Sequence, residues 1–430
     1  MKYTQFKILI TILFLGIFLP IGAQNNITLD ECIRQALERN FSLKMARNDM
    51  NIAENNVSVS PFLPSVSATG KQVQDNYTSS ETGAEDEGIR RNTYAAGVAM
   101  TWTIFDGLAM FADYSRQKQL FALSNQKVKI EVENLVMEVC SEYYNIIVQQ
   151  RLLESELTSL ALSKSRYANA EEKYMLGVIS GLDLQQARLD LNADSSKVLS
   201  QNETVNSAYI RLANLLTAGA ETKYNIHDTI VLSHEMNFDT LKARTIANNN
   251  TLIMARQGEI VSAKDLEIVR SARYPTLNFT SGYNFTKYDY PWSNYFSQTK
   301  GMYYGLNLSW NIFNGLETRR RIANAKIEAE NSRLAYLDAE NQILGDLNLL
   351  YNNYRNNIIV TLFEKENVEV AEKSLDIALA RYKLGSLSGL EFREYQNKYL
   401  EAINRRLTAL YQAKMSEIGL RLLCGEITEK

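Results

Sequence analysis

The sequence predicts a mainly α-helical protein that also carries membrane β-strands: duplicated long helical hairpins with four β-strands per chain. Three observations predict this fold class. Two motifs recur 208 positions apart, the five prolines leave two long intervals free of helix breakers, and the hydrophobic period changes from 3.6 to 2 between the helical stretches. The copies are assigned to residues 24–219 and 238–424, with a linker at 220–237 and a tail at 425–430.

The first recurring motif is a turn between two stretches of helical character. Residues 174–183 have the sequence YMLGVISGLD, and residues 382–391 have the sequence YKLGSLSGLE. Glycine ends a helix well because it takes the left-handed conformation without a Cβ penalty. An acid in the first turn of the next helix complements the helix dipole. Each copy is therefore predicted to be the tip of an antiparallel helical hairpin.

The second recurring motif ends a predicted strand. Residues 97–107, GVAMTWTIFDG, match residues 305–315, GLNLSWNIFNG, at the same offset of 208. Two motifs that repeat at one offset indicate internal duplication strongly. The strand-to-helix junctions are marked by Trp102, Phe105 and Gly107 in the first copy and by Trp310, Phe313 and Gly315 in the second.

The chain opens with a predicted secretory signal peptide over residues 1–23. Lys2 and Lys7 form the basic start, residues 8–19 are the apolar run, and Ala23 supplies the small residue before the cleavage point. A transmembrane anchor is the alternative, but the run is short for a span and a polar segment follows it. No cysteine stands just after the cleavage point, so a lipid-anchored N-terminus is not expected.

A helix is predicted over residues 26–60. Thr28 can cap it, Glu31 completes a capping box, and Asn40 can mark a break. Two prolines then end it. The other predicted helices cover residues 107–175, 182–217, 236–270, 315–384 and 390–424. The longest of these are roughly 100 Å long at 1.5 Å per residue.

Four stretches alternate with a period of two. They cover residues 62–73, 93–105, 277–285 and 304–312. One face is apolar and aromatic and the other small and polar, which is typical of a membrane β-barrel. A soluble sandwich also alternates, but its strands are usually shorter than the roughly 10 to 13 residues predicted here. The stretches 76–92 and 287–301 are predicted as outward loops between paired strands.

Composition and motifs exclude other classes. A net charge of −3 without a basic patch argues against a nucleic-acid binder. Cys32, Cys140 and Cys424 are predicted to be core thiols, and His227 and His234 surface or packing residues rather than a metal pair. The sequence offers no nucleophile–base pairing, phosphate loop or metal cluster, so neither a cofactor nor enzymatic activity is expected.

Four strands cannot enclose a lumen, and an open sheet cannot survive in lipid because its edge groups have no water to pair with. Oligomerisation solves this problem. Three chains supply twelve strands, an even number within the known range. We therefore expect a 12-stranded trimeric barrel that continues into an α-helical tunnel.

The chain resembles the TolC family of outer-membrane efflux proteins over nearly all of its mature sequence. The resemblance rests on the duplicated element order, the Trp-x-Ile-Phe-[Asp/Asn]-Gly junctions and the Arg-Tyr-x-x-Gly tip at Arg381–Gly385, where the first tip has Lys173 in place of the arginine. It implies a homotrimeric channel-tunnel in the outer membrane of a Gram-negative bacterium, surrounded by outer-membrane lipid. Cargo would arrive from an inner-membrane pump, of RND or ABC type, through a periplasmic adaptor (membrane fusion) protein, for efflux or type I secretion.

The resemblance also implies roles for particular residues. Adaptor contact is implied at the tips, at Tyr174, Gly177, Gly181, Arg381, Tyr382, Gly385 and Gly389. A periplasmic gate of acidic rings is implied at Asp183, Glu391 and Glu394. Helix-start chemistry accounts for acids there equally well, so both interpretations stay open. The family's aspartates are glutamates at 391 and 394, and Gln186 is the first-copy counterpart of Glu394, which leaves the ring width open.

Two other functions are the alternatives to an export channel. A non-transporting, periplasm-spanning envelope scaffold would account for the long helices but would leave the alternating strand pairs unexplained. An enzyme has no support in the motifs. The sequence does not identify the cargo, because drugs, metals, lipids or a polypeptide would all pass the same kind of tunnel.

Overall fold

The computed structural model describes residues 25–81, 84–219, 224–233, 236–291 and 295–426. The predicted signal peptide and His234 lie outside these residues. The chain forms two compact units, and each takes segments from both halves of the sequence. The strand unit comprises residues 45–129 and 250–343, and the hairpin unit comprises the described parts of 1–44, 130–249 and 344–430.

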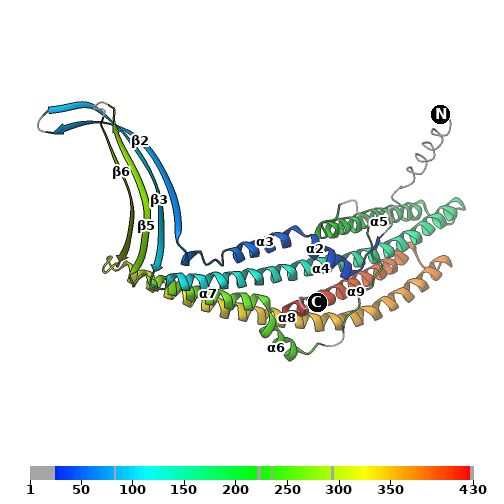
Figure 1. The fold of residues 1–430 in the computed structure, drawn as a ribbon. Coiled ribbons are helices and arrows are strands. Elements are labelled where there is room, and N and C mark those ends of the chain that lie inside the picture. Colours follow the sequence, from blue (N-terminus) through cyan, green and yellow to red (C-terminus); the bar gives the residue numbers. More distant parts are fainter. Residues whose placement is uncertain (1–24, 82–83, 220–223, 234–235, 292–294, 427–430) are drawn as a thin grey trace, which may run out of the picture. The chain divides into compact units, whose positions relative to one another are not determined.

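The strand unit contains a four-stranded antiparallel sheet in the order β2-β3-β5-β6 (Figure 1). Its strands are β2 (Ser65–Glu81), β3 (Ala84–Phe105), β5 (Thr276–Tyr290) and β6 (Tyr295–Ser309). Each half of the sequence gives one hairpin, and β3 pairs with β5 at the centre. β2 and β6 are therefore the edges of the sheet in a single chain.

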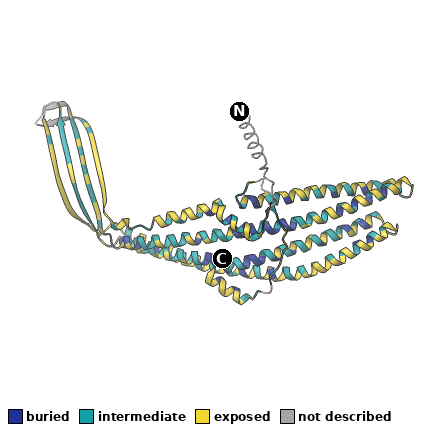
Figure 2. Cartoon of the chain, turned by 45° about the vertical axis from the view of Figure 1, so that its right-hand side comes forward, coloured by how far each residue is buried: buried dark blue, intermediate teal, exposed yellow. Residues whose placement is uncertain are grey.

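The register separates the sheet into two faces, because directly paired residues in an antiparallel sheet share a face. The apolar face carries Val66, Val98, Trp102, Phe279, Tyr283, Met302, Tyr304, Leu306 and Leu308. The polar face carries Ser67, Thr69, Ala95, Gly97, Ala99, Asn278, Thr280, Gly282, Asn284, Gly305 and Asn307. The described strand residues are exposed or half-buried on both faces (Figure 2). The predicted alternation is confirmed.

The strands are longer than predicted, and the two predicted outward loops are largely strand. Polar hairpins can extend in this way because their backbone groups pair across the ladder. Side chains support the extension: Arg91 donates to the directly paired Asp75 at 2.8 Å, and the rings of Tyr290 and Tyr295 lie 5.8 Å apart.

The two strand-to-helix junctions differ. β3 runs to Phe105, which pairs with Leu277 of β5. β6 ends at Ser309, three residues before its predicted end, because its ladder to β5 stops there and it has no second neighbour in the described chain. Residues 310–312 therefore lack the pairing that keeps the end of β3 extended.

The hairpin unit is built on two long helices and the helices that return from them. The bounds are α4 (Ala109–Met175), α5 (Gly181–Leu215), α8 (Glu317–Lys383) and α9 (Gly389–Leu423). α4 and α8 have 67 residues each and begin in the strand unit. α5 and α9 have 35 residues each. The lengths of the predicted long helices are confirmed, with every bound repeated 208 positions later.

The two shorter predicted helices are each broken at an asparagine. The pieces are α2 (Leu29–Arg39) and α3 (Phe41–Asn55), then α6 (Phe238–Asn248) and α7 (Asn250–Ser271). Asn40 donates its amide to the carbonyl of Leu215 at 3.3 Å, and Asn249 donates to Leu423 at 3.2 Å. The break at Asn40 is confirmed, whereas a single helix over 236–270 was wrong because Asn249 repeats the same contact.

Only one of the two hydrogen bonds of the predicted capping box forms at the N-terminus of α2. The Thr28 hydroxyl accepts from the Glu31 N–H at 3.3 Å, which confirms Thr28 as the cap. The Glu31 carboxylate accepts from Arg34 at 2.6 Å, one turn along the helix. Glu31 therefore serves an exposed ion pair on the helix surface.

The linker between the halves is held by buried polar contacts. Glu417 of α9, 1% exposed, accepts from the Ser233 N–H at 3.0 Å and from its hydroxyl at 2.7 Å, and Tyr354 donates to the Ser233 carbonyl at 2.9 Å. Burial alone would raise the pKa of Glu417, but hydrogen bonds from Ser233 and Lys414 outweigh it and lower that pKa. A parallel pairing of β1 (Asn25–Asn26) with β4 (Tyr224–Asn225), which the sequence did not predict, also fixes the linker.

The three cysteines are buried, as predicted. Burial raises the pKa of Cys32 and of Cys140 to about 12, so both thiols stay protonated. The His227 ring lies 2.7 Å from the Asn225 amide. Within the described residues, no three side chains of metal-binding type are grouped. None of the described helices has the length and apolar character that crossing a membrane requires.

Candidate functional site: the helical hairpin tips

Both hairpin tips have the same backbone geometry. Gly177 has φ +74° and Gly385 has φ +75°. The N–H of Val178 donates to the carbonyl of Lys173 at 2.9 Å, and that of Ser386 donates to Arg381 at 2.9 Å. This is the glycine-ended helix terminus that the sequence predicted.

Each returning helix begins with a reciprocal capping box. The hydroxyl of Ser180 accepts from the Asp183 N–H at 3.2 Å, while the Asp183 carboxylate accepts from the Ser180 N–H at 3.3 Å. The second copy repeats this with Ser388 and Glu391, at 3.2 and 2.9 Å. Hydrogen bonds from the backbone and hydroxyl of Ser388 lower the pKa of Glu391. Helix-start chemistry is therefore present at two of the three predicted gate acids, Asp183 and Glu391, and both of these side chains remain exposed.

The third predicted gate acid, Glu394, has a charged partner on its own helix. Glu394 lies one turn beyond Glu391 and pairs with Lys398 at 2.6 Å. Both side chains are more than 60% exposed, so the pair contributes little to stability. Lys398 nevertheless offsets the charge of Glu394 locally, which makes Glu391 the less compensated of the two acids.

The tips expose large apolar side chains. These are Met175 (77%), Leu176 (71%), Val178 (67%), Leu182 (78%), Leu384 (83%) and Leu390 (73%). Beneath them, Tyr382 stacks on the buried ring of Phe392 at 5.4 Å. Lys173 of the first tip lies 5.8 Å from the Tyr382 ring, so residues from both predicted tips meet here.

Two arginines, the buried Arg166 and the largely buried Arg393, join the second hairpin to the first a few turns behind the tips. Arg393 of α9 donates both terminal nitrogens to Asp194 of α5, at 2.6 and 2.5 Å. Arg166 of α4 pairs with Asp190 of α5 and donates to the carbonyl of Gly389 at 3.3 Å. Asp194 is fully buried and Arg166 is 3% exposed.

Further polar groups complete the surroundings of Asp194. Ser163 donates to its carboxylate at 2.5 Å, and Gln396 donates to the hydroxyl of Ser159 at 2.6 Å. Burial alone raises the pKa of Asp194, but hydrogen bonds from Arg393 and Ser163 outweigh it, so the pKa lies below its ordinary value. Asp194 is thus a buried carboxylate that stays charged because its partners surround it. We call Arg166, Asp190, Asp194, Arg393, Gln396, Ser159 and Ser163 the tip network.

The tip network was not predicted from the sequence. One signal was available: Ala187, Asp190 and Asp194 recur at helical spacing on the buried face of α5. Charged residues on a core-facing stripe require partners. The partner arginines could not be identified, because Arg393 lies 199 residues from Asp194.

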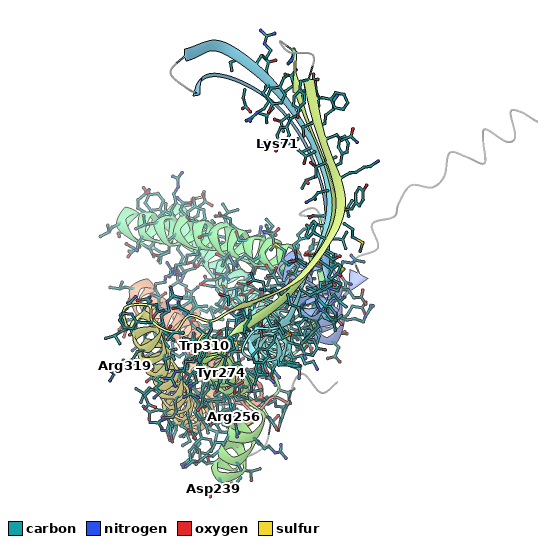
Figure 3. All side chains as sticks on the ribbon, turned by 60° about the vertical axis from the view of Figure 1, so that its left-hand side comes forward. Lys71, Asp239, Arg256, Tyr274, Trp310 and Arg319 are labelled. Carbon is teal, nitrogen blue, oxygen red and sulfur yellow. The ribbon has the colours of Figure 1, made fainter. Side chains whose placement is uncertain are left out.

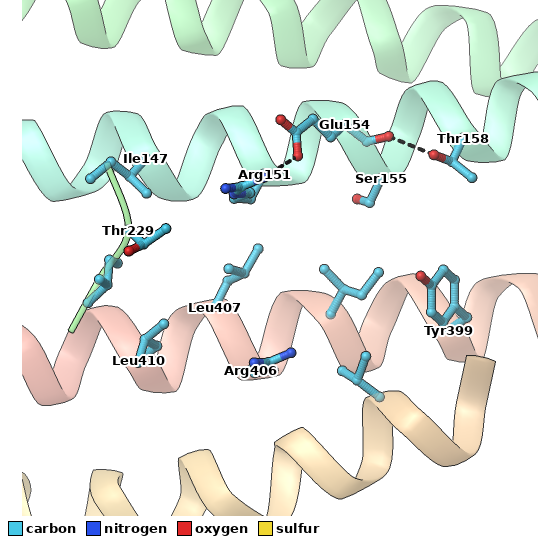
Figure 4. A pocket seen from close by; sticks show the side chains of 13 residues that line it. Ile147, Arg151, Glu154, Ser155, Thr158, Thr229, Tyr399, Arg406, Leu407 and Leu410 are labelled. Carbon is cyan, nitrogen blue, oxygen red and sulfur yellow. Dashed lines mark hydrogen bonds and ion pairs between the residues drawn. The ribbon is translucent and has the colours of Figure 1, made fainter. Parts of the chain in front are cut away.

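The hairpin unit also contains a groove of about 490 Å³ between α4 and α9 (Figure 4). Ile147, Leu407 and Leu410 give it apolar walls, and Thr229 of the linker closes one end. Arg151 at its edge pairs with Glu154 on its own helix at 2.8 Å. The groove contains none of the predicted site residues.

At the predicted strand-to-helix junctions, the two tryptophans make equivalent contacts. Trp102 donates its indole N–H to the carbonyl of Phe62 at 2.9 Å, and Trp310 (Figure 3) donates to Arg273 at 3.1 Å. Gly107 and Gly315 have φ +74° and +65°. Only Gly107 is tightly enclosed, since a Cβ there would lie 2.4 Å from the carbonyl oxygen of Ser271. Phe313 is 77% exposed, consistent with the unpaired end of β6.

Comparison with known proteins places these elements in a family. The family profile described as "Outer membrane efflux protein" matches residues 32–218 and 241–426, once for each half. No curated protein sequence matches the chain.

Several solved structures share the fold at low sequence identity. The Campylobacter jejuni CmeC outer membrane channel has a TM-score of 0.79 at 16% identity, covering 93% of this chain and 85% of that one. The Vibrio cholerae outer membrane protein VceC has a TM-score of 0.75 at 14% identity, covering 92% and 96%. The open state of the Neisseria gonorrhoeae MtrE outer membrane channel has a TM-score of 0.73 at 15% identity, covering 93% and 89%.

Proposed function

This chain belongs to the outer membrane efflux protein family, and we propose that it forms the passive exit duct of a tripartite efflux or type I secretion system. The observation that carries the proposal is the two-faced sheet. An exposed apolar face lies opposite a face of small and polar residues, and long helices follow each hairpin. These are the features of strands with lipid on one side and water on the other.

We propose that three chains close the barrel. The edges β2 and β6 leave unpaired backbone groups, which are costly in lipid. Pairing β6 of one chain with β2 of the next removes every edge and gives twelve strands. The protein would then reside in the outer membrane of a Gram-negative bacterium, with its helices forming a periplasmic tunnel.

The tips are the proposed contact surface for a periplasmic adaptor, which links the duct to an inner-membrane pump. Two features support this proposal. Apolar side chains at the ends of helices stay largely exposed, and the glycine-ended turns fix their backbone in the same geometry in both copies. Energy for transport would come from the pump.

We retain the acidic gate as a proposal, with Glu391 as its main charge and Glu394 and Asp183 beside it. All three side chains are exposed near the tips. Rings of carboxylates attract cations and narrow a pore electrostatically. Divalent cations should therefore block the channel from the tip side.

The function is tested by mass and conductance together. The complex extracted from the outer membrane in mild detergent should have the mass of three chains and conduct ions in a planar bilayer. A monomer or dimer without conductance would overturn the proposal and favour the envelope scaffold.

The gate is tested in the same bilayer. The double variant Glu391→Gln, Glu394→Gln should be markedly less sensitive to divalent block than wild type, since two of the three proposed gate charges are removed and only Asp183 remains. Lys398→Gln is the control, because it breaks the Glu394–Lys398 ion pair without removing an acid. Divalent block of this variant should be as strong as in wild type or stronger. Unchanged block in the double variant would remove the gate without affecting the duct.

A further inference from the structure

The apolar face of the sheet has a defined outer limit. Starting near the helices, its rows run from Leu308 through Leu306, Tyr304 and Met302 on β6. The next residue on the same face is Lys300, which pairs directly with Phe285. One row farther out, Lys287 pairs with Gln298 and with Tyr94. Apolar side chains thus give way to two lysines within two rows.

These lysines are close neighbours on one face. Lys287 and Lys300 are diagonal partners across the β5–β6 ladder, so their Cβ atoms are no more than about 8 Å apart. Each side chain is long enough for the two ammonium groups to meet on one anion. Lys287 lies over the ring of Phe296, 5.2 Å from its centre, which holds it beside an aromatic side chain.

The surrounding charges leave this position positive. Within the described part of the chain, neither lysine belongs to an ion pair. Asp289 lies one row farther out on the same face, opposite Phe296. Arg90 also lies on this face, so from the Lys300 row out to the Arg90 row three basic residues face one acid, Asp289. The acids Glu81, Glu85 and Asp86 belong to the hairpin end beyond these rows.

The geometry points to a binding site for a phosphorylated glycolipid headgroup of the outer leaflet at Lys287 and Lys300. This inference rests on the proposed membrane placement of the sheet. The apolar rows would contact acyl chains, while the lysines stand where the headgroup layer begins. An ammonium pair at that depth complements a phosphate monoester, and the aromatic rings beside it suit a sugar–lipid boundary.

The chain offers a matched control for the two lysines. Lys71 on β2 pairs with Ala95, which lies between Tyr94 and Ala96 in sequence. By register, Lys71 (labelled in Figure 3) therefore lies between the rows of the two lysines but on the polar face. Replacing it removes one positive charge at this height without touching the apolar face.

Native mass spectrometry of the purified complex tests the inference, with bis-phosphorylated lipid A and its dephosphorylated form as probes. Wild type should prefer the phosphorylated lipid. The double variant Lys287→Gln, Lys300→Gln should bind it about 30-fold more weakly, because each interfacial lysine contributes about one factor of five. Lys71→Gln should bind it like wild type.

Three results would overturn the inference: equal binding of the two lipids by wild type, unchanged binding in the double variant, or an equal loss in Lys71→Gln. The mass and conductance of the same preparations separate this failure from failure of the proposed function. A conducting trimer without phosphate-dependent binding would refute the lipid site alone. A complex that neither conducts nor assembles would refute both.

Discussion

At the residue scale, the tip network shows why single charges matter in this molecule. Asp194 is fully buried, and its carboxylate accepts hydrogen bonds from Arg393, Ser163 and Ser159. A buried ion pair need not stabilise a fold more than apolar residues would, but removing one partner leaves an uncompensated charge. The network therefore makes contact between the two hairpins sensitive to any single substitution.

Asp194→Asn should lower the free energy of unfolding by about 3–5 kcal/mol, because the largely buried Arg393 then loses its counter-charge. Chemical unfolding followed by circular dichroism would measure it. Glu330→Gln is the control, because the Glu330–Arg333 pair is a surface pair that should contribute nothing measurable. Equal effects of the two substitutions would contradict the importance of burial.

The same residue predicts a dependence on pH. The pKa of Asp194 is lowered by folding, so its stabilising contribution is present above the ordinary aspartate pKa, near 3.9. The contribution is lost as the pH falls from there through the lowered folded value. The unfolding midpoint of wild type should therefore fall more steeply with decreasing pH below about pH 5 than the midpoint of Asp194→Asn does. Unfolding midpoints measured at a series of acidic pH values test this. Parallel curves would show that Asp194 does not titrate with unfolding.

The sequence predicted the tips but not the tip network, because the residues that pair in the network lie far apart in the sequence. Gly177, Ser180 and Asp183 act within one turn of chain, so local rules identify their roles. The partners Asp194 and Arg393 come from different halves of the sequence, and only the packing of α5 against α9 brings them together. A core-facing aspartate indicates that a partner exists without indicating which one.

At the element scale, helix and strand bounds follow from whether each segment has a neighbour. The long helices end at the predicted glycines, because their termination is local. The strands extend beyond prediction because pairing, rather than apolar character, decides their length. The early end of β6 has the same cause, since an edge strand lacks a second ladder.

Two glycines should respond oppositely to alanine. Gly385→Ala should destabilise the hairpin by about 1–2 kcal/mol, because φ there is +75°. Gly345→Ala, in the interior of α8 with open space around it, should stabilise by about 0.5–1 kcal/mol through lower chain entropy. Thermal unfolding of both variants beside wild type measures the difference. The same sign for both would mean that the tip backbone does not need its left-handed residue.

At the scale of the whole molecule, the duplicated halves explain why one chain is not enough. Two hairpins pair through β3 and β5 and leave β2 and β6 as edges, so the pairing that joins the halves within a chain can be repeated between chains. The sequence predicted four strands with two faces, but the ladder order needed the structure. The proposed closure by three copies would pair these edges and so remove the cost of unpaired backbone in lipid.

Adjacent residues on β6 can decide between a membrane barrel and a periplasmic scaffold. Leu306 is 67% exposed on the apolar face, and Asn307 is its neighbour on the polar face. If the apolar face contacts lipid, Leu306→Arg should cost up to about 2–4 kcal/mol per chain and reduce the trimer recovered from outer membranes, whereas Asn307→Arg should be tolerated in the lumen. Quantifying the trimer in membrane fractions measures both. In a scaffold surrounded by water, an arginine at Leu306 would be as harmless as one at Asn307, and equal recovery of the two variants would contradict the barrel.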